Sequence, residues 1–367
     1  MKPKTIRDGV TLSSGSRVLE NGYAAALKRS AFALRLIVKA FYEGVVRNKS
    51  VLLIGVSLFY LLGACTAPVF DPKNFVFIRG GEFTMGSPEN EVGREDHIIV
   101  NSNSNDEFSF SPRLWDREIL HQSSETQHQV KLSDFYMGKY AVTVGEFRKF
   151  VEATGYQTEA EKRVLSDIVV NNETWKAVAI NWRHGVSDSM RPQNEENHPV
   201  LHVSWNDAVA YCKWLSKETG KKFRLPTEAE REYACRAGTT TPFNTGNNLT
   251  TDQANYDGNY PYNDNPKGVY RENTVAVNSF VPNAWGLYNM HGNVFEWCSD
   301  WYGGTYYDEC KANGTVTNPA GPSKGSDRVL RGGGWGNPAG SCRSADRGDF
   351  TSRNPNGDVG FRVVFVP

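Results

Sequence analysis

The chain has 367 residues, with 41 Lys and Arg against 41 Asp and Glu, so its formal net charge is zero. This balance argues against a nucleic-acid-binding protein, because such proteins use a surplus of Lys and Arg to displace counterions from phosphates. Hydrophobic residues at 39% and aromatic residues at 12% exclude a disordered chain. The 34 glycines and 17 prolines predict many turns and exclude a helical bundle.

The N-terminal region, residues 1–64, is predicted to be an extension that ends in an export signal. Val51–Ala64 is an apolar run of 14 residues. A membrane-spanning helix needs about 20 residues, so the run fits the hydrophobic region of a signal peptide better. The sequence Leu-Gly-Ala-Cys at 62–65 resembles a bacterial lipobox. It predicts acylation of Cys65 and an exported protein anchored to a bacterial membrane, at the outer membrane or cell surface. An ordinary signal peptide or a membrane anchor with a chance cysteine is the alternative.

Short strands are predicted at the start of the mature chain. After a tether at 65–74, strand patterns occur at 75–78 and 83–86, separated by a glycine turn. Residues 87–128 are polar and predict a surface insertion. Strand character returns at 130–132 and 135–137.

Three helices are predicted from their N-terminal signals. Thr143 with Glu146 and Thr227 with Glu230 have the spacing of capping boxes, and another helix is expected to begin near Ser204. From 236 to 367 helical periodicity is almost absent, and brief strands are expected at 329–330 and 361–365. We therefore expect one loop-rich α+β domain over 75–367.

A set of motifs in fixed order carries a family resemblance. The motifs are GGEFTMG at 80–86, YAVT at 140–143, PVLHVSW at 199–205, RLPTEAEREY at 224–233, GLYN at 286–289, GNVFEW at 292–297, RGG at 331–333 and GFR at 360–362. Together they resemble the formylglycine-generating enzyme, or sulfatase-modifying factor, family, over nearly the whole mature chain. The resemblance implies a C-type-lectin-like architecture with little regular secondary structure.

The catalytic copper site of that family is not expected here. The family's enzymes oxidise a substrate cysteine with a copper ion held by two cysteines after the Gly-Gly motif, since Cu(I) prefers sulfur ligands. In this chain Asn337 stands at the first cysteine position, and the second falls near Ala339 in a shorter loop. Cys342 is the only thiol of the segment and the only catalytic candidate. We therefore expect no catalytic residues and no copper.

A related iron-dependent branch of the family is also disfavoured. Its metal histidines lie on an added helix, whereas the seven histidines of this chain form no such pattern. His128 and His202 are predicted to be structural or surface residues.

Structural Ca²⁺ is the cofactor that the resemblance implies. One site would use the Glu296 carboxylate with the carbonyls of His291, Gly292 and Val294. A second would use Asn255 and Tyr256 with carbonyls near Gly268 and Tyr270. Ca²⁺ takes six to eight oxygen ligands, which irregular backbone supplies well. The alternative is that Glu296 pairs with an arginine and Asn255 caps a turn.

Disulfide bonds follow from the same resemblance. Cys212 and Cys235 match half-cystines of the family, but Val363 and Ser344 stand where their partners would be. A replacement pair between Cys298 and Cys342 is the remaining expectation.

Residues 334–358 are predicted to carry a ligand-binding surface. Between framework residues, this segment has small and polar residues that resemble the variable region of diversity-generating-retroelement proteins, including treponemal surface lipoproteins of this fold. The predicted ligand-binding residues are Gly334, Gly336, Asn337, Gly340, Ser341, Asp346, Gly348, Asp349, Phe350, Ser352, Asn356, Gly357 and Asp358.

The sequence thus predicts a membrane-anchored lipoprotein that binds a protein or glycan at the cell envelope without catalysis. Two alternatives stay open. The first is a formylglycine-generating or related oxidase acting on a protein cysteine, and the second is a component of an envelope or secretion assembly.

Overall fold

The computed structural model describes residues 70–94, 125–163, 165–170, 173–178 and 180–367. The chain separates into two compact units, Met1–Pro68 and Val69–Pro367. The first unit, with the predicted export signal and Cys65, lies outside the described residues. Among the residues that are described, no helix is long and apolar enough to cross a membrane.

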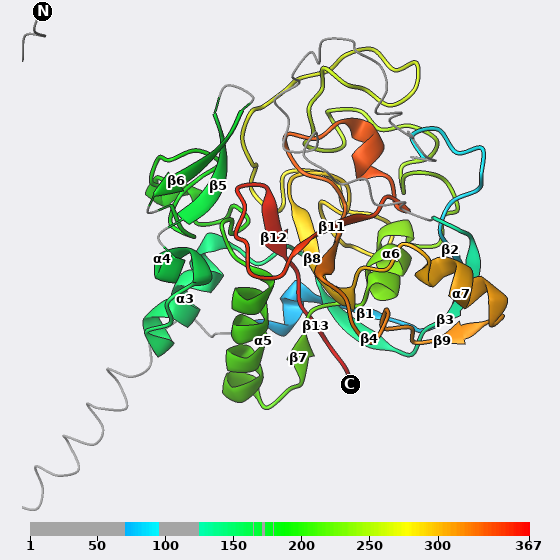
Figure 1. The fold of residues 1–367 in the computed structure, drawn as a ribbon, viewed down its shortest axis with the longest axis horizontal. Coiled ribbons are helices and arrows are strands. Elements are labelled where there is room, and N and C mark those ends of the chain that lie inside the picture. Colours follow the sequence, from blue (N-terminus) through cyan, green and yellow to red (C-terminus); the bar gives the residue numbers. More distant parts are fainter. Residues whose placement is uncertain (1–69, 95–124, 164, 171–172, 179) are drawn as a thin grey trace, which may run out of the picture. The chain divides into compact units, whose positions relative to one another are not determined.

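The first sheet joins the two ends of the second unit (Figure 1). It has the order β1 (Phe75–Ile78), β4 (Phe135–Gly138), β13 (Val364–Phe365) and β7 (Phe223–Arg224), and all neighbours are antiparallel. The strands β2 (Glu82–Met85) and β3 (His128–Lys131) pair with each other instead and form a second sheet with β9 (Val316–Thr317). The strands predicted at both ends of the insertion are confirmed, and β1 and β2 belong to different sheets.

The central four-stranded sheet is built from the C-terminal part of the chain. Its order is β11 (Gly348–Thr351), β10 (Asp327–Arg331), β8 (Phe295–Trp301) and β12 (Val359–Phe361). The strand β8 contains the second half of the predicted GNVFEW motif, where no strand was expected. A two-stranded sheet of β5 (Leu165–Val170) and β6 (Glu173–Val178) was also not predicted.

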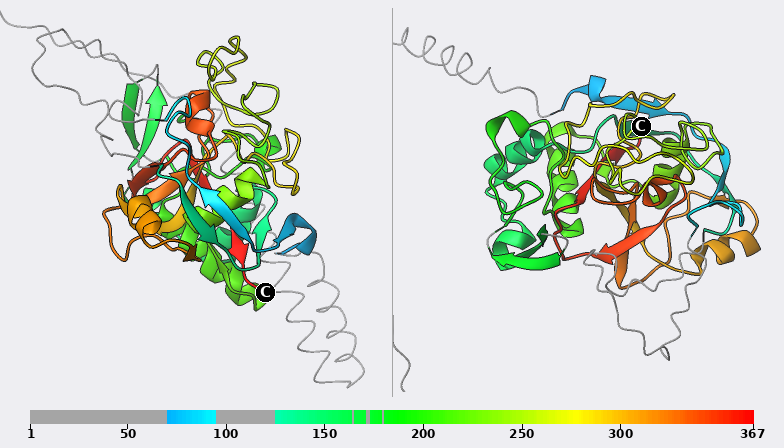
Figure 2. Two further views of the ribbon diagram at one scale, coloured as in Figure 1. Left: turned by 90° about the vertical axis from the view of Figure 1, so that its right-hand side faces the viewer. Right: turned by 90° about the horizontal axis from the view of Figure 1, so that it is seen from above.

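The three predicted helices are confirmed together with their caps. The helices α3 (Val144–Thr154), α5 (Trp205–Thr219) and α6 (Glu228–Arg236) each begin with a complete capping box. Shorter helices are α4 (Glu159–Arg163), α7 (Tyr306–Ala312), η1 (Pro72–Asn74), η2 (Gln193–Glu195) and η3 (Ala339–Cys342). Long loops between α6 and β8 gather at one end of the unit, away from the β1–β4–β13–β7 sheet (Figures 1 and 2).

Two apolar clusters form the main core. One packs α3 and α5 against the central sheet through residues such as Phe147, Tyr211 and Trp297. The other lies between β1, β3, β4 and α6, with Ile78, Phe135 and Leu287. The predicted surface insertion at 87–128 is narrower than expected at both ends. Ser87, Glu125 and His128 are all buried. Ser87 donates to Glu125, Glu125 pairs with Arg343 of the C-terminal segment, and the His128 ring packs on Tyr307 of α7.

Candidate functional site

The C-terminal segment between β10 and β12 folds over the end of the central sheet. Gly333 has a φ of +72°, and a Cβ at this position would lie 2.6 Å from the Cys342 sulfur. Only glycine allows this turn and this close approach at once. The RGG motif therefore turns the chain from β10 directly onto the short helix η3.

Asn337, which the resemblance aligns with the family's first copper cysteine, has a structural role in this fold. The Asn337 side chain accepts a 2.8 Å hydrogen bond from the Gly334 N–H, and its carbonyl accepts one of 2.8 Å from the Asp257 N–H. Its side chain points into its own loop and is buried. Asn337 thus fixes the loop in which a metal-binding thiolate would be needed.

Cys342 lies in the interior and has no second thiol from its own segment beside it. It packs with Ala339, Phe243 and Tyr262 in a small apolar cluster. Burial raises the pKa of its thiol, which opposes formation of the thiolate that soft metals and nucleophilic chemistry require. The chemistry of this donor set does not fit a two-thiolate copper site.

Part of the predicted ligand-binding surface is internal. Asn337, Asp349, Asn356 and Asp358 are between 1% and 8% exposed. The glycines at 334, 348 and 357 are buried as well. The prediction that these seven residues face a ligand is therefore wrong, because the loops fold back onto the central sheet. The predicted residues that stay partly exposed are Gly336, Gly340, Ser341, Asp346, Phe350 and Ser352.

Two internal polar side chains of this segment lack partners. The Oδ1 atoms of Asp358 and Asn356 are buried and make no hydrogen bond to any residue that the structure describes. Burial raises the pKa of Asp358 to about 7. Such a carboxylate is costly to keep charged, since a hydrogen bond from its own backbone offsets only part of its desolvation.

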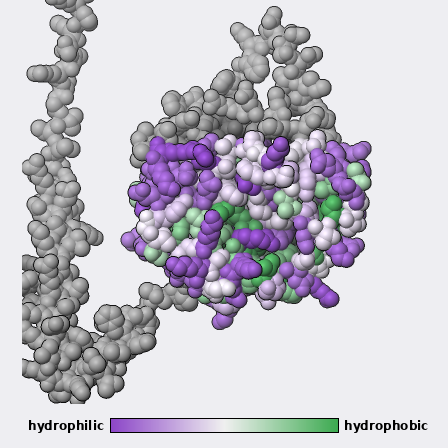
Figure 3. Space-filling view, turned by 60° about the horizontal axis from the view of Figure 1, so that its bottom comes forward, coloured by the Kyte–Doolittle hydropathy of each residue, from purple (hydrophilic) through white to green (hydrophobic). Residues whose placement is uncertain are grey.

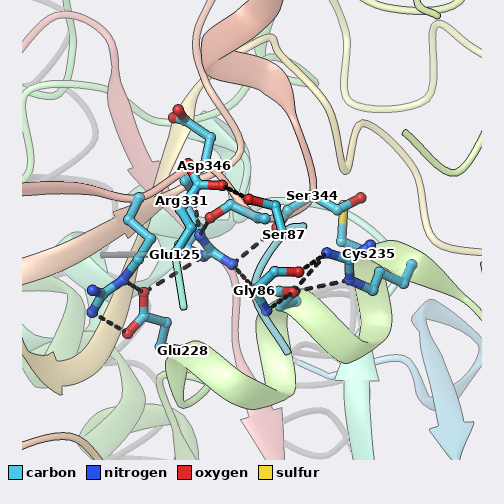
Figure 4. Close-up of polar contacts among 12 residues, drawn as sticks. Gly86, Ser87, Glu125, Glu228, Cys235, Arg331, Ser344 and Asp346 are labelled. Atoms are coloured by element: carbon cyan, nitrogen blue, oxygen red, sulfur yellow. Dashed lines mark hydrogen bonds and ion pairs between the residues drawn. The ribbon is translucent and has the colours of Figure 1, made fainter. Parts of the chain in front are cut away.

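A network of buried ion pairs lies beneath the segment (Figure 4). Arg347 donates two hydrogen bonds to Glu228, of 2.7 and 2.9 Å, and Arg331 donates to Glu232. Both carboxylates project from α6, whereas the arginines come from β10 and the C-terminal segment. Burial opposes ionisation of Glu228, but Arg347 and Arg331 outweigh it and lower its pKa, so Glu228 is charged at neutral pH.

Arg343 ties the two ends of the insertion to the C-terminal segment. Its guanidinium donates to Glu91 at 2.8 Å, to Glu125 at 2.7 and 2.8 Å, and to the Gly93 carbonyl at 2.8 Å. Ser87 also donates to Glu125. Arg343 therefore holds residues on both sides of 95–124 with one planar group.

Cys235 is the thiol that comes nearest to a catalytic arrangement. Its sulfur lies 3.7 Å from both ring nitrogens of His291 and 3.7 Å from the Ser344 hydroxyl. However, His291 uses Nδ1 to donate to the Cys342 carbonyl at 2.7 Å, and its Nε2 accepts from the Asn244 N–H at 3.0 Å. Both ring nitrogens thus have backbone partners, yet although burial opposes it, His291 together with Arg231 and Ser344 lowers the pKa of the Cys235 thiol to about 6.

The predicted calcium ligand Glu296 is occupied by two arginines. Its carboxylate accepts hydrogen bonds from Arg231 Nε at 2.8 Å and from Arg362 Nε and Nη2 at 3.1 and 2.8 Å. Arg231 also donates to the Met290 carbonyl at 3.0 Å. Two guanidinium groups on one carboxylate repel a divalent cation, so these residues do not fit Ca²⁺. The carboxylate expected to bind Ca²⁺ together with His291, Gly292 and Val294 is thus paired as the alternative predicted, with arginine.

At the second predicted calcium site, the hydrogen bonds of the Asn255 side chain show whether it has an oxygen available for an ion. Asn255 is fully buried, and its Nδ2 donates to the Asn273 carbonyl at 2.8 Å and to Asn293 Oδ1 at 3.1 Å. Its Oδ1 makes no hydrogen bond within the described ranges. An orphaned amide oxygen, followed in the chain by the buried Tyr256, is a donor that a Ca²⁺ ion accepts. Asn255 Oδ1 is thus an oxygen that fits the predicted ion, and the calcium site here stays a prediction.

The predicted disulfide between Cys298 and Cys342 is wrong. All five cysteines that the structure describes are free. Cys298 lies on β8, whereas Cys342 belongs to the cluster around Phe243. Cys235 does lie beside Ser344, as the half-cystine match implies.

The arginines of these networks were missed by sequence reasoning. Arg231, Arg331, Arg343 and Arg362 are at most 1% exposed. One signal was available: α6 reads EAEREYACR, which has charged residues on every side. A helix without an apolar face in a compact domain must bury some of its charges in pairs.

The chain resembles known proteins over most of its length. Residues 64–366 match the family described as "Sulfatase-modifying factor enzyme 1-like domain". The formylglycine-generating enzyme of Bos taurus is 39% identical over 274 residues, which cover 68% of this chain and 70% of that protein. The structure of PvdO from Pseudomonas aeruginosa matches with a TM-score of 0.58 and 29% identity, covering 80% of this chain and 94% of PvdO. Treponema denticola variable protein 1 shares the fold, with a TM-score of 0.53, 22% identity and coverage of 80% and 95%.

Proposed function

Since the chain belongs to the family of sulfatase-modifying factor enzyme 1-like domains, we propose that it uses the family's fold for binding rather than catalysis. In this proposal the protein is exported, and an acylated Cys65 holds it at a bacterial membrane. Its partner is a protein or a glycan of the cell envelope.

The proposal rests on the loop after the RGG motif, which does not present the two thiolates of a copper site. Asn337 hydrogen-bonds inside this loop, and Cys342 is buried with a raised pKa. Oxidation of a substrate cysteine by the family's mechanism needs two adjacent thiolates on copper. This loop supplies one thiol, and that thiol faces the interior.

The exposed part of the same segment is the surface that we assign to binding. Gly336, Gly340 and Ser341 are partly exposed, and a side chain at Gly340 would meet no atom within 4 Å. The nearby Tyr260 is 41% exposed. Loops on a rigid base tolerate sequence change and commonly carry binding residues. If near-identical copies of this protein differ in sequence within the segment, the differences should concentrate at exposed positions such as these.

Structural Ca²⁺ at Asn255 and Tyr256 is a further part of the proposal. An ion there would order the loops that carry Tyr260 through oxygen ligands alone. Chelation should then lower the stability of the native protein, whereas an Asn255→Ala variant should be insensitive to chelation.

The competing function is a formylglycine-generating or related oxidase, which the 39% identity to the Bos taurus enzyme favours. The test incubates the purified full chain with copper, oxygen and a cysteine-containing sulfatase peptide, beside a Cys342→Ala variant. We expect no aldehyde in the peptide by mass spectrometry and no difference between the proteins. Aldehyde formation that the substitution abolishes would overturn the proposal.

Export and anchoring are tested separately. The mass of the N-terminal peptide of the protein isolated from membranes should show acyl chains on Cys65. A Cys65→Ser variant should lose them and should not be processed at this position. A mature N-terminus elsewhere would contradict the anchor without affecting the binding function.

A further inference from the structure

One face of the β1–β4–β13–β7 sheet carries a row of aromatic side chains, in which Phe77 is exposed and Phe223 and Phe365 are buried against the neighbouring core. In the strand register, Phe77 lies opposite Tyr136, Tyr136 opposite Phe365, and Phe365 opposite Phe223. Adjacent rings are 5.2, 4.6 and 5.0 Å apart between centroids. Because side chains alternate between the two faces of a strand, this row crosses the whole sheet on one side. The solvent-facing side of an antiparallel sheet is normally polar.

The row borders a groove that is open to solvent. Phe70, Phe75, Tyr136, Phe365 and Val366 line it, with a volume of about 600 Å³. Val366, which lines the groove, is 40% exposed, and Phe77, at the end of the aromatic row, is 48% exposed. Figure 3, in which this end comes forward, shows apolar surface at the centre with hydrophilic residues around it.

Lysines stand at the rim of this apolar surface. The Lys221 ammonium lies 5.0 Å from the Phe365 ring centre and 6.0 Å from that of Phe70. Lys222 beside it is exposed and also lines the groove. Aromatic rings with neighbouring lysines are typical of surfaces that lie in the headgroup region of a bilayer, where the rings enter the interface and the ammonium groups meet anionic lipids.

The chain reaches this face directly from the predicted lipid anchor. Phe70, in the groove, follows Cys65 by five residues. Five extended residues span at most about 18 Å. An acylated Cys65 would therefore hold the groove within that distance of the membrane surface.

We propose that the aromatic face, comprising Phe70, Phe77, Tyr136, Phe365 and Val366 with Lys221 and Lys222, rests on the membrane that carries the acyl chains. The inference depends on the proposed acylation of Cys65. It goes further, because it fixes which end of the domain faces the lipid. The occupant of the groove is the headgroup layer of a bilayer that contains anionic phospholipid.

The test uses the acylated full chain in vesicles of phosphatidylethanolamine and phosphatidylglycerol. Single cysteines at Phe77→Cys or Val366→Cys carry an environment-sensitive nitrobenzoxadiazole label; the five described native cysteines are buried. The matched control is Val269→Cys, which is 56% exposed. It belongs to the loops between α6 and β8, at the other end of the unit in Figure 1.

We expect a blue-shifted emission and protection from aqueous iodide at residues 77 and 366 and neither at 269. Two labelled sites are used because the substitution at Phe77 could disturb β1. Residue 366 lies beyond the last strand, so its label reports on the face independently of β1. Replacing both lysines, Lys221→Glu with Lys222→Glu, should reduce protection at residue 366 in anionic vesicles but not in purely zwitterionic phosphatidylcholine vesicles.

Equal quenching at residues 77, 366 and 269 on an acylated protein would overturn this inference and leave the lipoprotein proposal standing. Absence of acyl chains on Cys65, shown by mass spectrometry before reconstitution, would overturn both. Protection of residues 77 and 366 in solution without vesicles would also contradict the inference, because it would mean that protein rather than lipid covers the face.

Discussion

Replacing Glu296 by glutamine is expected to destabilise the protein strongly without changing its shape. The carboxylate lies between the guanidinium groups of Arg231 and Arg362 and is 1% exposed. Gln has the same size but carries an amide NH₂ in place of one oxygen. That group would point its hydrogens at donors, and two buried arginines would lose their counter-charge.

The size of the effect follows from the contacts. Glu296 accepts three hydrogen bonds from the two arginines, at 2.8, 3.1 and 2.8 Å. Glutamine can keep those at one oxygen only. Removing one partner of a buried ion pair costs about 3–5 kcal/mol. The lower part of this range applies, since Arg362 also donates to the carbonyls of Gly138, Lys139 and Tyr288.

The loss should depend on pH in a defined direction. Burial opposes ionisation of Glu296, but the two arginines outweigh it and keep its pKa below the ordinary 4.5. Its charge therefore stabilises the fold fully above about pH 4.5 and progressively less as the pH falls through the lower pKa of the folded protein. The difference in unfolding free energy between wild type and Glu296→Gln should be full at pH 7 and shrink below pH 4.5.

Urea unfolding followed by tryptophan fluorescence measures this difference, with and without a calcium chelator. The arginine pair predicts the same difference in both conditions. If chelation lowered the stability of the wild type to that of Glu296→Gln, calcium rather than arginine would neutralise the carboxylate, and the assignment would fail. Arg231→Lys is the companion variant: it keeps the charge but loses the planar geometry, and about 1–2 kcal/mol should be lost.

Three further predictions concern the C-terminal segment. Asp358→Asn should stabilise the fold by up to about 4 kcal/mol at pH 8 and hardly at pH 4. The reason is that a pKa raised from 3.8 to about 7 makes the charged form of Asp358 costly as the pH rises. Urea unfolding at both pH values measures the difference. Ser344→Cys should form a disulfide with Cys235, 109 residues away. The bond should add about 4 kcal/mol to the unfolding free energy under oxidising conditions, and equal masses after alkylation of the unfolded variant with and without reductant would contradict the pairing. Arg343→Lys should cost about 2–3 kcal/mol, since one ammonium cannot serve Glu125 bidentately and its other partners at once; an unchanged urea midpoint would refute this.

Local features of the fold were predictable because their causes are local. The capping boxes of α3 and α6 depend on residues three positions apart, and the structure shows both hydrogen bonds of each box. The family motifs in order predicted the architecture as well. Residue type alone decides one point of the site: Asn337 stands where the resemblance places a copper cysteine, and an asparagine supplies no thiolate.

Long-range features were not predictable from one sequence. Whether a polar residue of the C-terminal segment faces solvent depends on how the loop folds back. The buried Asn356 and Asp358 are as polar as Ser352, which is partly exposed. The Glu296 pairing joins residues 65 and 66 positions apart. The strand β8 has charged residues within an apolar run, and only its pairing with β10 and β12 makes it the centre of a sheet.

The two proposed surfaces lie at different ends of the same unit, which limits how the protein can work. The aromatic face belongs to the sheet that contains β1 and β13, whereas Gly336, Gly340 and Ser341 lie on the loop and η3 that follow β10, toward the other end (Figure 1). With the aromatic face on the membrane, these exposed residues point away from it. A partner would then be met from the aqueous side, and the buried ion pairs of Arg331, Arg343 and Arg347 would hold the binding loops on a rigid base. Labelling at Gly340→Cys should therefore report solvent in vesicles and lose that exposure only when a partner binds.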